Sequence, residues 1–515
     1  MFNTHLVKSA LLGGMILAAG AAYAQQDTTQ ALLDLLVKKG YVSQQEAADL
    51  KTQAQANAAA QAASMTAPPA SAPVPAGAVV SARSGQSPLS FKIGSADFTP
   101  FGFLDFTALY RGTLNGGDIG SSFGSIPYAN TANGQLSETR FSAKNSRLGL
   151  RVDSKVGGTK VLGYVETDFL GAGPTNINVA SNSDTLRMRV YFVDLKNGAW
   201  EFLAGQDWSL LTPNRKGLSP LPSDIFFSQD VDTNYQVGLV WGRTPQVRAI
   251  YHATDEWTLG VSAENPDQYV GSATTLPSNF TATQIDNGSN GTATPNVTPD
   301  LIGKIAFDTK FGDLPFHADM AGLFRQFKIN TYVPASGINA NATAEGYGGS
   351  FNMNLSVMPN LQLIENAFAS KGGGRYISTG LGPDFVVAPP DANGVDQIEL
   401  VYSYADMLGF EWDAVPTTKI YGYFGQAHYG MRTGQQANGS YVGYGYTGSS
   451  NSNNKLIEEY TLGLAQVLWK GASYGDLKFL AQYSYLNRSP WFVAAGAPSG
   501  THMNMFYVDL RYDLP

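Results

Sequence analysis

The residues of this sequence best suited to chemistry are arginines within apolar stretches, either single or two to four positions apart. Arg147 and Arg151 lie in one such stretch, Arg187 and Arg189 in a second, and Arg248 in a third. Clustered positive charge attracts anions and raises their local concentration. If the three stretches lie side by side, the spacing predicts a basic wall that draws anions to it.

Two acidic residues fall between the members of this basic wall. Glu166 and Asp168 are two positions apart, as Arg187 and Arg189 are, and lie in a stretch between those of Arg151 and Arg187. They leave a second interpretation open, in which the acids pair with the arginines across neighbouring strands and stiffen the wall. The two interpretations are compatible with each other.

Strands must position these side chains, because apolar and polar residues alternate repeatedly through roughly the last 400 residues. Phe351, Met353 and Leu355, for example, alternate with Asn352 and Asn354. Period-2 patterning predicts strands with one apolar and one polar face. In a soluble sandwich the apolar face meets a second sheet, whereas in a membrane barrel it meets lipid and the polar face lines water.

The cost of charge in lipid predicts which side chains face inward. A charged side chain on the lipid face costs roughly 2–4 kcal/mol near the midplane. Around the arginines of 187–189, this assigns Met188, Val190 and Phe192 to the outside and Tyr191 to the inside.

The N-terminus favours export and therefore the membrane alternative. Lys8 precedes an apolar run from Ala10 to Ala22, and Ala22-Tyr23-Ala24 is a small-x-small cleavage site. This pattern predicts a secretory signal peptide over residues 1–24. An N-terminal membrane anchor is the alternative, but the apolar run is short for one.

The bulk composition agrees with a membrane barrel and excludes several other classes. The mean hydropathy of -0.13 is compatible with strands that are half polar, and 12% of the residues are aromatic. There is no cysteine, and the net charge is -8. We therefore expect no thiol catalysis, no cysteine-ligated metal and no nucleic-acid partner.

Two segments precede the predicted barrel. Residues 25–64 combine a leucine-rich helix face with a capping box at Ser43 to Glu46, which predicts a periplasmic helical segment able to form a trimeric coiled coil. A frayed spacer is the alternative. Residues 65–97 are rich in Pro and Ala and predict an extended linker. The barrel is expected over residues 98–515.

The alternation predicts an all-β fold, a sixteen-stranded antiparallel transmembrane barrel. Counted separately, Tyr235–Trp241 and Gln246–Tyr251 give seventeen strands, but single-chain bacterial barrels have an even number. We therefore expect one strand over 235–253, bulged at Arg243-Thr244-Pro245. The expected strands are 98–110, 140–153, 160–170, 185–195, 199–208, 235–253, 256–265, 300–311, 315–327, 346–357, 361–369, 397–412, 418–429, 456–469, 476–486 and 502–514. All long connections then fall on one side.

The long connection 209–234 carries apolar residues that would be costly to leave in water. An inward fold that narrows the barrel would bury them and would bring Arg215, Lys216 and Asp224 to the pore. Packing of this loop at a trimer interface is the alternative.

Several local motifs resemble the DcaP-like trimeric porins of Gram-negative outer membranes. They include Ser146-Arg147-Leu148-Gly149-Leu150-Arg151, Ala204-Gly205-Gln206-Asp207-Trp208 and Arg243-Thr244-Pro245-Gln246-Val247-Arg248, within the same order of signal, helix, linker and barrel. The resemblance implies a homotrimer in outer-membrane lipid and lipopolysaccharide. It also implies passive diffusion of small anionic, dicarboxylate-like solutes.

Catalytic signals are weak, so a porin is the expected function. His252, His317, His428 and His502 are scattered without metal-ligand spacing, and no cofactor motif is present. Two alternatives stay open: a structural or adhesin barrel tethered to peptidoglycan through its N-terminal segment, and an outer-membrane enzyme.

Overall fold

The computed structural model describes residues 87–171, 185–287, 295, 298–378 and 380–515. The predicted signal peptide and the predicted helical segment lie outside these residues. Within the described part of the chain, no helix has the length and apolar character needed to cross a membrane.

The described residues form twenty-two strands and five short 3-10 helices. The strands are β1 (Phe91–Ile93), β2 (Ala96–Arg111), β3 (Glu138–Ser142), β4 (Arg147–Val156), β5 (Thr159–Asp168), β6 (Arg187–Asn197), β7 (Trp200–Trp208), β8 (Arg243–His252), β9 (Trp257–Glu264), β10 (Asp300–Phe311), β11 (Leu314–Val333), β12 (Ile338–Met358), β13 (Leu361–Lys371), β14 (Phe385–Ala388), β15 (Gln397–Leu400), β16 (Tyr402–Val415), β17 (Thr418–Tyr429), β18 (Arg432–Gln435), β19 (Tyr441–Tyr444), β20 (Asn454–Gly471), β21 (Gly475–Pro490) and β22 (Thr501–Asp513). The helices are η1 (Phe123–Ser125), η2 (Asn133–Gln135), η3 (Ala282–Gln284), η4 (Pro334–Ser336) and η5 (Gly374–Tyr376).

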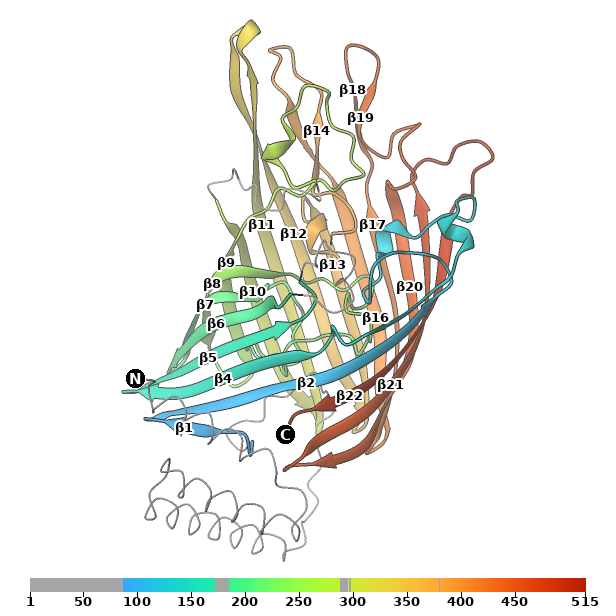
Figure 1. Cartoon of the computed structure of the whole chain (residues 1–515). Coiled ribbons are helices and arrows are strands. Elements are labelled where there is room, and N and C mark those ends of the chain that lie inside the picture. The colour runs from blue at the N-terminus through green and yellow to red at the C-terminus, as the bar shows by residue number, and fades with distance from the viewer. Residues whose placement is uncertain (1–86, 172–184, 288–294, 296–297, 379) are drawn as a thin grey trace, which may run out of the picture. The chain divides into compact units, whose positions relative to one another are not determined.

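Sixteen of these strands close into an antiparallel barrel, as the sequence predicted (Figure 1). Neighbours in sequence pair from β4 to β13 and on through β16, β17, β20, β21 and β22, and β2 closes the ring by pairing with both β22 and β4. The long hairpin of β11 and β12 extends beyond its neighbours on the side that carries the long connections. All sixteen barrel strands therefore have paired edges, which a membrane-spanning sheet requires.

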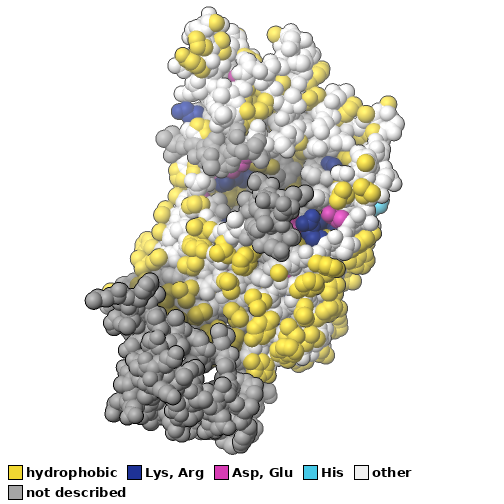
Figure 2. Space-filling view, in the orientation of Figure 1, with side chains coloured by type: hydrophobic (Ala, Val, Ile, Leu, Met, Phe, Trp, Pro, Cys, Tyr) yellow, Lys and Arg dark blue, Asp and Glu magenta, His cyan; other side chains and the backbone are white. Residues whose placement is uncertain are grey.

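The outer face of the barrel is apolar and the inner face is polar, which confirms the predicted alternation. On β22, Phe506, Val508 and Leu510 are 50%, 41% and 45% exposed, whereas Tyr507 and Asp509 are buried. Figure 2 shows hydrophobic side chains spread over the outer face of the strands, with very few charges among them. Such an apolar outer surface suits contact with lipid.

The predicted strand 235–253 is wrong in its first half. β8 begins only at Arg243 and pairs with β7 from Trp208 onward without a bulge. The residues before it run through the lumen, where the Val237 amide donates to Glu459 Oε2 at 2.8 Å and the Val240 amide donates to Asn366 Oδ1 at 3.1 Å. Their apolar pattern reflects burial against the inner wall and not alternation in a strand. The predicted count of sixteen strands is correct. It holds because the residues just before Arg243 form no barrel strand, and not because a bulge joins two strand segments.

A bulge in β6 overturns part of the predicted facing. Glu166 pairs with Val190 and Thr167 pairs with Met188, so Arg189 is an extra residue in β6. From Val190 onward, each side chain of β6 therefore lies on the face opposite to the one predicted. Val190 is therefore buried inside the barrel, as is Phe192, and Tyr191 takes the outer face. The prediction for Met188 holds, since it is 53% exposed.

Two smaller differences concern the beginning of the barrel. The expected strand 140–153 is split into β3 and β4. In the break between them, Ser146 Oγ accepts a hydrogen bond from the Asp105 amide of β2 at 2.9 Å. β1 pairs with β2 from Phe91 to Phe98, so part of the segment predicted as linker forms a short hairpin on the barrel.

Candidate solute site in the barrel lumen

The connection between β7 and β8, residues 209–242, folds into the barrel. Leu218, Ile225, Phe226 and Phe227 are at most 4% exposed, which agrees with the inward fold expected from their apolar character. They pack with residues that point inward from the strands, so burial of apolar area holds the segment in the lumen. We call residues 209–242 the constriction loop.

Inward polar side chains of β10 to β12 fix the near part of the constriction loop. The Asn214 amide donates to Asp319 Oδ2 at 3.0 Å, and the Asn214 carbonyl accepts from Asn352 and Asn354, each at 2.8 Å. Lys304 Nζ donates to Asn214 Oδ1 at 2.8 Å. The asparagines that alternate on the polar face of β12 thus hold backbone groups that would otherwise be buried without a partner.

Arg215 fastens the constriction loop to another part of the wall. Its guanidinium forms a two-pronged ion pair with Glu411 of β16, at 2.7 and 3.1 Å. Lys216, the next residue, is exposed. Asp224 takes part through its backbone, since its carbonyl accepts from the Arg215 amide at 2.7 Å. Of these three predicted pore residues, Arg215 therefore anchors the loop, Asp224 contacts Arg215 through the backbone, and Lys216 has an exposed, positively charged side chain.

Glycine allows the far part of the constriction loop to lie directly on the wall. Gly238 has a φ of +92°, and a Cβ on Gly425 of β17 would lie 1.8 Å from the Val237 carbonyl oxygen. Any larger residue at position 425 would push the loop away from the strand.

A second loop meets the constriction loop inside the barrel, which the sequence reasoning missed. Val240 and Ile377 form a backbone bridge, and the Trp241 amide donates to the Tyr376 carbonyl at 2.9 Å. The same loop continues into the fully buried run Phe385 to Ala388. That apolar run in a long connection is the signal that could have revealed it, by the argument already applied to residues 209–234.

The acids and arginines of β4, β5 and β6 meet in one ion-pair cluster. Arg189 Nε lies 2.6 Å from Glu166 Oε1, and its Nη1 lies 2.7 Å from Asp168 Oδ2. Arg187 Nη2 contacts the same Asp168 oxygen at 2.7 Å, and Arg147 Nη1 lies 3.7 Å from Glu166. The pairing interpretation therefore describes Glu166 and Asp168, both of which are buried.

Arg243, at the start of β8, joins this cluster without a carboxylate of its own. Its guanidinium carbon lies 5.0 Å from the centre of the Trp208 ring and 5.9 Å from that of Trp241. Its Nε and Nη1 are buried and find no hydrogen-bond partner in the described part of the chain. We call Arg147, Arg187, Arg189 and Arg243 the arginine wall. Its four positive charges face only two carboxylates, so two are in excess.

A cavity of about 380 Å³ opens onto the arginine wall. Arg187, Arg243 and Trp241 line one part of it, and Lys144 and Asp118 line another. Lys144 and Asp118 are paired at 2.6 Å. The excess charge therefore comes from the two arginines, and we call this space the charged cavity. Arg243 was missed as a site residue because it was assigned to a bulge.

Two other predicted arginines lie apart from this cluster. Arg151 pairs with Asp153 at 2.6 Å, and Arg248 lies 3.3 Å from Asp207 and donates to Gln246. Their charges are compensated locally. Among the described residues there is no group of three or more acidic or histidine side chains arranged to hold a metal ion.

A closed sixteen-stranded barrel with an apolar exterior, a polar interior and a loop folded into the lumen defines the class of outer-membrane β-barrel proteins. Within this class the chain resembles the outer-membrane channel DcaP of Acinetobacter baumannii, with a TM-score of 0.57 and 18% identity over 82% of this chain and 98% of that one. The resemblance to DcaP-like channels inferred from the sequence is thus confirmed for the fold.

More distant structures also match. An anion-selective porin from Comamonas acidovorans covers 81% of this chain and all of its own at 13% identity, with a TM-score of 0.43. OmpT of Vibrio cholerae covers 82% of this chain and 99% of its own at 12% identity, with the same TM-score. No protein-family model and no curated protein matches the chain.

Proposed function

We propose that the protein is a porin through which small hydrophilic, mainly anionic solutes diffuse passively across the outer membrane of a Gram-negative bacterium. The single observation that carries this proposal is the charge excess of the arginine wall. A fixed positive charge without a counter-ion, in a cavity lined in part by the constriction loop, favours anions over cations.

The arrangement of the excess charge favours dicarboxylate-like solutes. Arg187 and Arg243 both line the charged cavity, and the planar guanidinium group binds carboxylate well. Arg187 already holds Asp168, but its side chain is 37% exposed and so retains access to a solute. Two available cations within one cavity are suited to two negative charges.

The remaining parts of the proposal rest on the N-terminal sequence and on the resemblance to DcaP-like porins. We expect a homotrimer in lipid and lipopolysaccharide, an exported chain with its N-terminal segment in the periplasm, contact of that segment with peptidoglycan, and transport without catalysis. The fold of the similar DcaP channel is compatible with this assignment.

Reversal potentials in planar bilayers test the proposal. Under a salt gradient the purified protein should give a potential of the sign expected for anion preference, and a dicarboxylate should reduce the current more than a monocarboxylate does. Insertion should produce three conductance steps if the protein is a trimer. An electrically silent protein, or a cation-selective one, would contradict the proposal.

A further inference from the structure

A second cavity lies among the loops on the side of the long connections and carries no charge. It encloses about 540 Å³, within the range of about 300–1,000 Å³ typical of small-molecule sites. Its lining contains Ser, Thr, Asn, Tyr and Gly residues but, within the described residues, no Asp, Glu, Lys, Arg or His. We call it the neutral cavity. Ser122 and Asn234 also line the charged cavity, so the two spaces adjoin.

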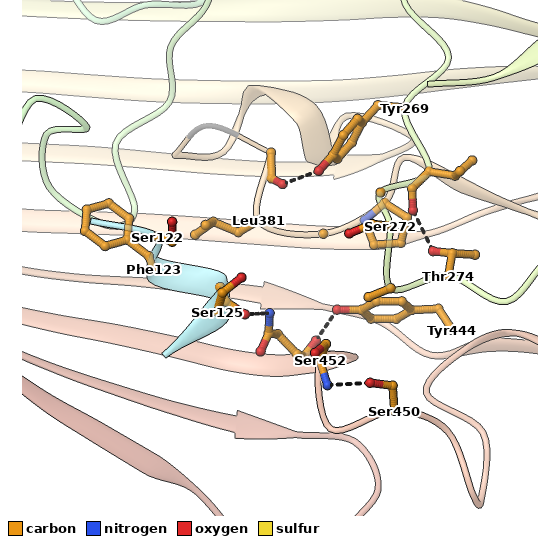
Figure 3. Close-up of a pocket in the computed structure, with 18 of the residues that line it drawn as sticks. Ser122, Phe123, Ser125, Tyr269, Ser272, Thr274, Leu381, Tyr444, Ser450 and Ser452 are labelled. Carbon is orange, nitrogen blue, oxygen red and sulfur yellow. Dashed lines mark hydrogen bonds between the residues drawn. The ribbon is translucent and has the colours of Figure 1, made fainter. Parts of the chain in front are cut away.

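Contacts among four of the five segments that line the neutral cavity build it (Figure 3). Tyr269 donates its hydroxyl to the Gly380 carbonyl at 2.7 Å, which joins the loop after β9 to the loop after β13. Asn454 Nδ2 donates to the Gly124 carbonyl at 3.0 Å, which joins β20 to η1. Thr275 and Gly443 exchange two backbone hydrogen bonds. The cavity is therefore held by specific contacts and does not depend on one loop's conformation.

Several hydroxyl groups at this cavity remain available to a solute. The side-chain oxygens of Ser122, Ser125, Ser272 and Ser452 form no hydrogen bond with other described residues, although all four serines line the cavity. Each hydroxyl can both donate and accept. The set therefore offers neutral donors and acceptors from three of the four segments.

The aromatic residues of the cavity are also neutral. Burial raises the pKa of Tyr269 to about 12, and burial also raises the pKa of Tyr444. Both phenols therefore stay protonated at physiological pH, and their rings add apolar faces beside the hydroxyl groups. An ion entering this space would lose hydration without meeting an opposite charge, whereas an uncharged polar solute would exchange water for equivalent hydrogen bonds.

We infer that the neutral cavity binds uncharged polyhydroxylated solutes, such as a mono- or disaccharide, at the outer entrance of the barrel. The serine hydroxyls match sugar hydroxyl groups, and the aromatic rings match the apolar faces of a sugar ring. This site adjoins the charged cavity and adds a class of ligand to the anions of the proposed function.

Sucrose titration of single channels tests the inference. The full-length protein is inserted into phosphatidylcholine bilayers free of lipopolysaccharide, and sucrose is added on the side of the long loops. Conductance should fall in a saturable manner, beyond the fall in bulk conductivity. A polyethylene glycol of similar mass should reduce the current only in proportion to bulk conductivity.

Two variants separate binding from general exclusion. The double variant Ser272→Ala/Ser452→Ala removes two available hydroxyls that line the neutral cavity alone and should raise the half-saturating sucrose concentration about tenfold. Ser440→Ala, in the β18–β19 turn outside the cavity, is the matched control and should leave it unchanged. The inference is overturned if sucrose acts like polyethylene glycol, or if the double variant matches the native chain.

The reversal potential is measured in the same membranes. It reports the anion preference of the arginine wall independently of sucrose binding, so failure of one proposal is distinguishable from failure of the other. An unchanged reversal potential in the double variant also shows that the barrel and its constriction loop are intact.

Discussion

Replacement of Arg243 by glutamine should reduce the anion preference of the channel without damaging the barrel. Arg243 is the member of the arginine wall for which the described residues provide no ion pair, so its removal leaves no carboxylate without a partner. Glutamine keeps hydrogen-bonding capacity and fits beside Trp208 and Trp241. The variant therefore changes the charge of the wall while its internal pairs remain.

The expected size of the effect follows from Coulomb's law. A carboxylate about 5 Å from a guanidinium group gains about 0.8 kcal/mol in fully aqueous surroundings, and more where protein replaces water. This energy corresponds to a factor of about four in the local anion concentration. We therefore expect Arg243→Gln to lower the anion-over-cation permeability ratio at least about fourfold, since cations are also repelled less.

The assay is the reversal potential under a salt gradient, for folded protein whose single-channel conductance has been verified. Lys310→Gln is the matched control, because it removes an equal charge at the exposed end of β10. Arg243→Lys should retain most of the preference. If Arg243→Gln and Lys310→Gln both leave the ratio unchanged, the excess charge of the arginine wall does not set selectivity and the reasoning is refuted.

Three further predictions concern the other parts of the site. Arg189→Gln should leave Glu166 and Asp168 partly unpaired and destabilise the barrel by about 3–5 kcal/mol, seen as a lower temperature of heat modification; an unchanged temperature would show that these pairs are not structural. Arg215→Ala and Glu411→Gln should each release the constriction loop and raise single-channel conductance to a similar degree, while equal conductance to the native chain would show that other anchors suffice. Because the chain lacks cysteine, a fluorophore can be attached at Tyr191→Cys alone, and a lipid-soluble quencher should reach it; quenching only by a water-soluble agent would restore the facing first predicted.

The sequence was sufficient for most of the wall of the barrel. Charge in lipid is costly enough that alternation alone places Phe506 and Val508 outside and Tyr507 and Asp509 inside. Closure without free edges, together with an even strand number, then gives the count of sixteen. These constraints act on every strand in the same way, so local errors such as the one at 235–241 do not change the architecture.

Register within a strand could not be predicted, because a bulge carries no reliable sequence signal. The extra residue at Arg189 lets two consecutive side chains, Arg189 and Val190, both lie inside the barrel. In a regular strand one of them would face lipid. The bulge is stable here because Arg189 reaches two carboxylates and Val190 packs in the apolar cluster around Tyr164, neither of which is visible in the local sequence.

Which inward arginines stay without a carboxylate partner could not be predicted either, since this depends on which side chains the loops bring close. Sequence reasoning counted Arg215 and Arg248 toward an anion site, yet Glu411 and Asp207 compensate them. It gave no weight to Arg243, whose charge has no such partner. In a lumen crossed by two loops, the proposed selectivity therefore rests less on the number of inward arginines than on the few that folding leaves without a carboxylate.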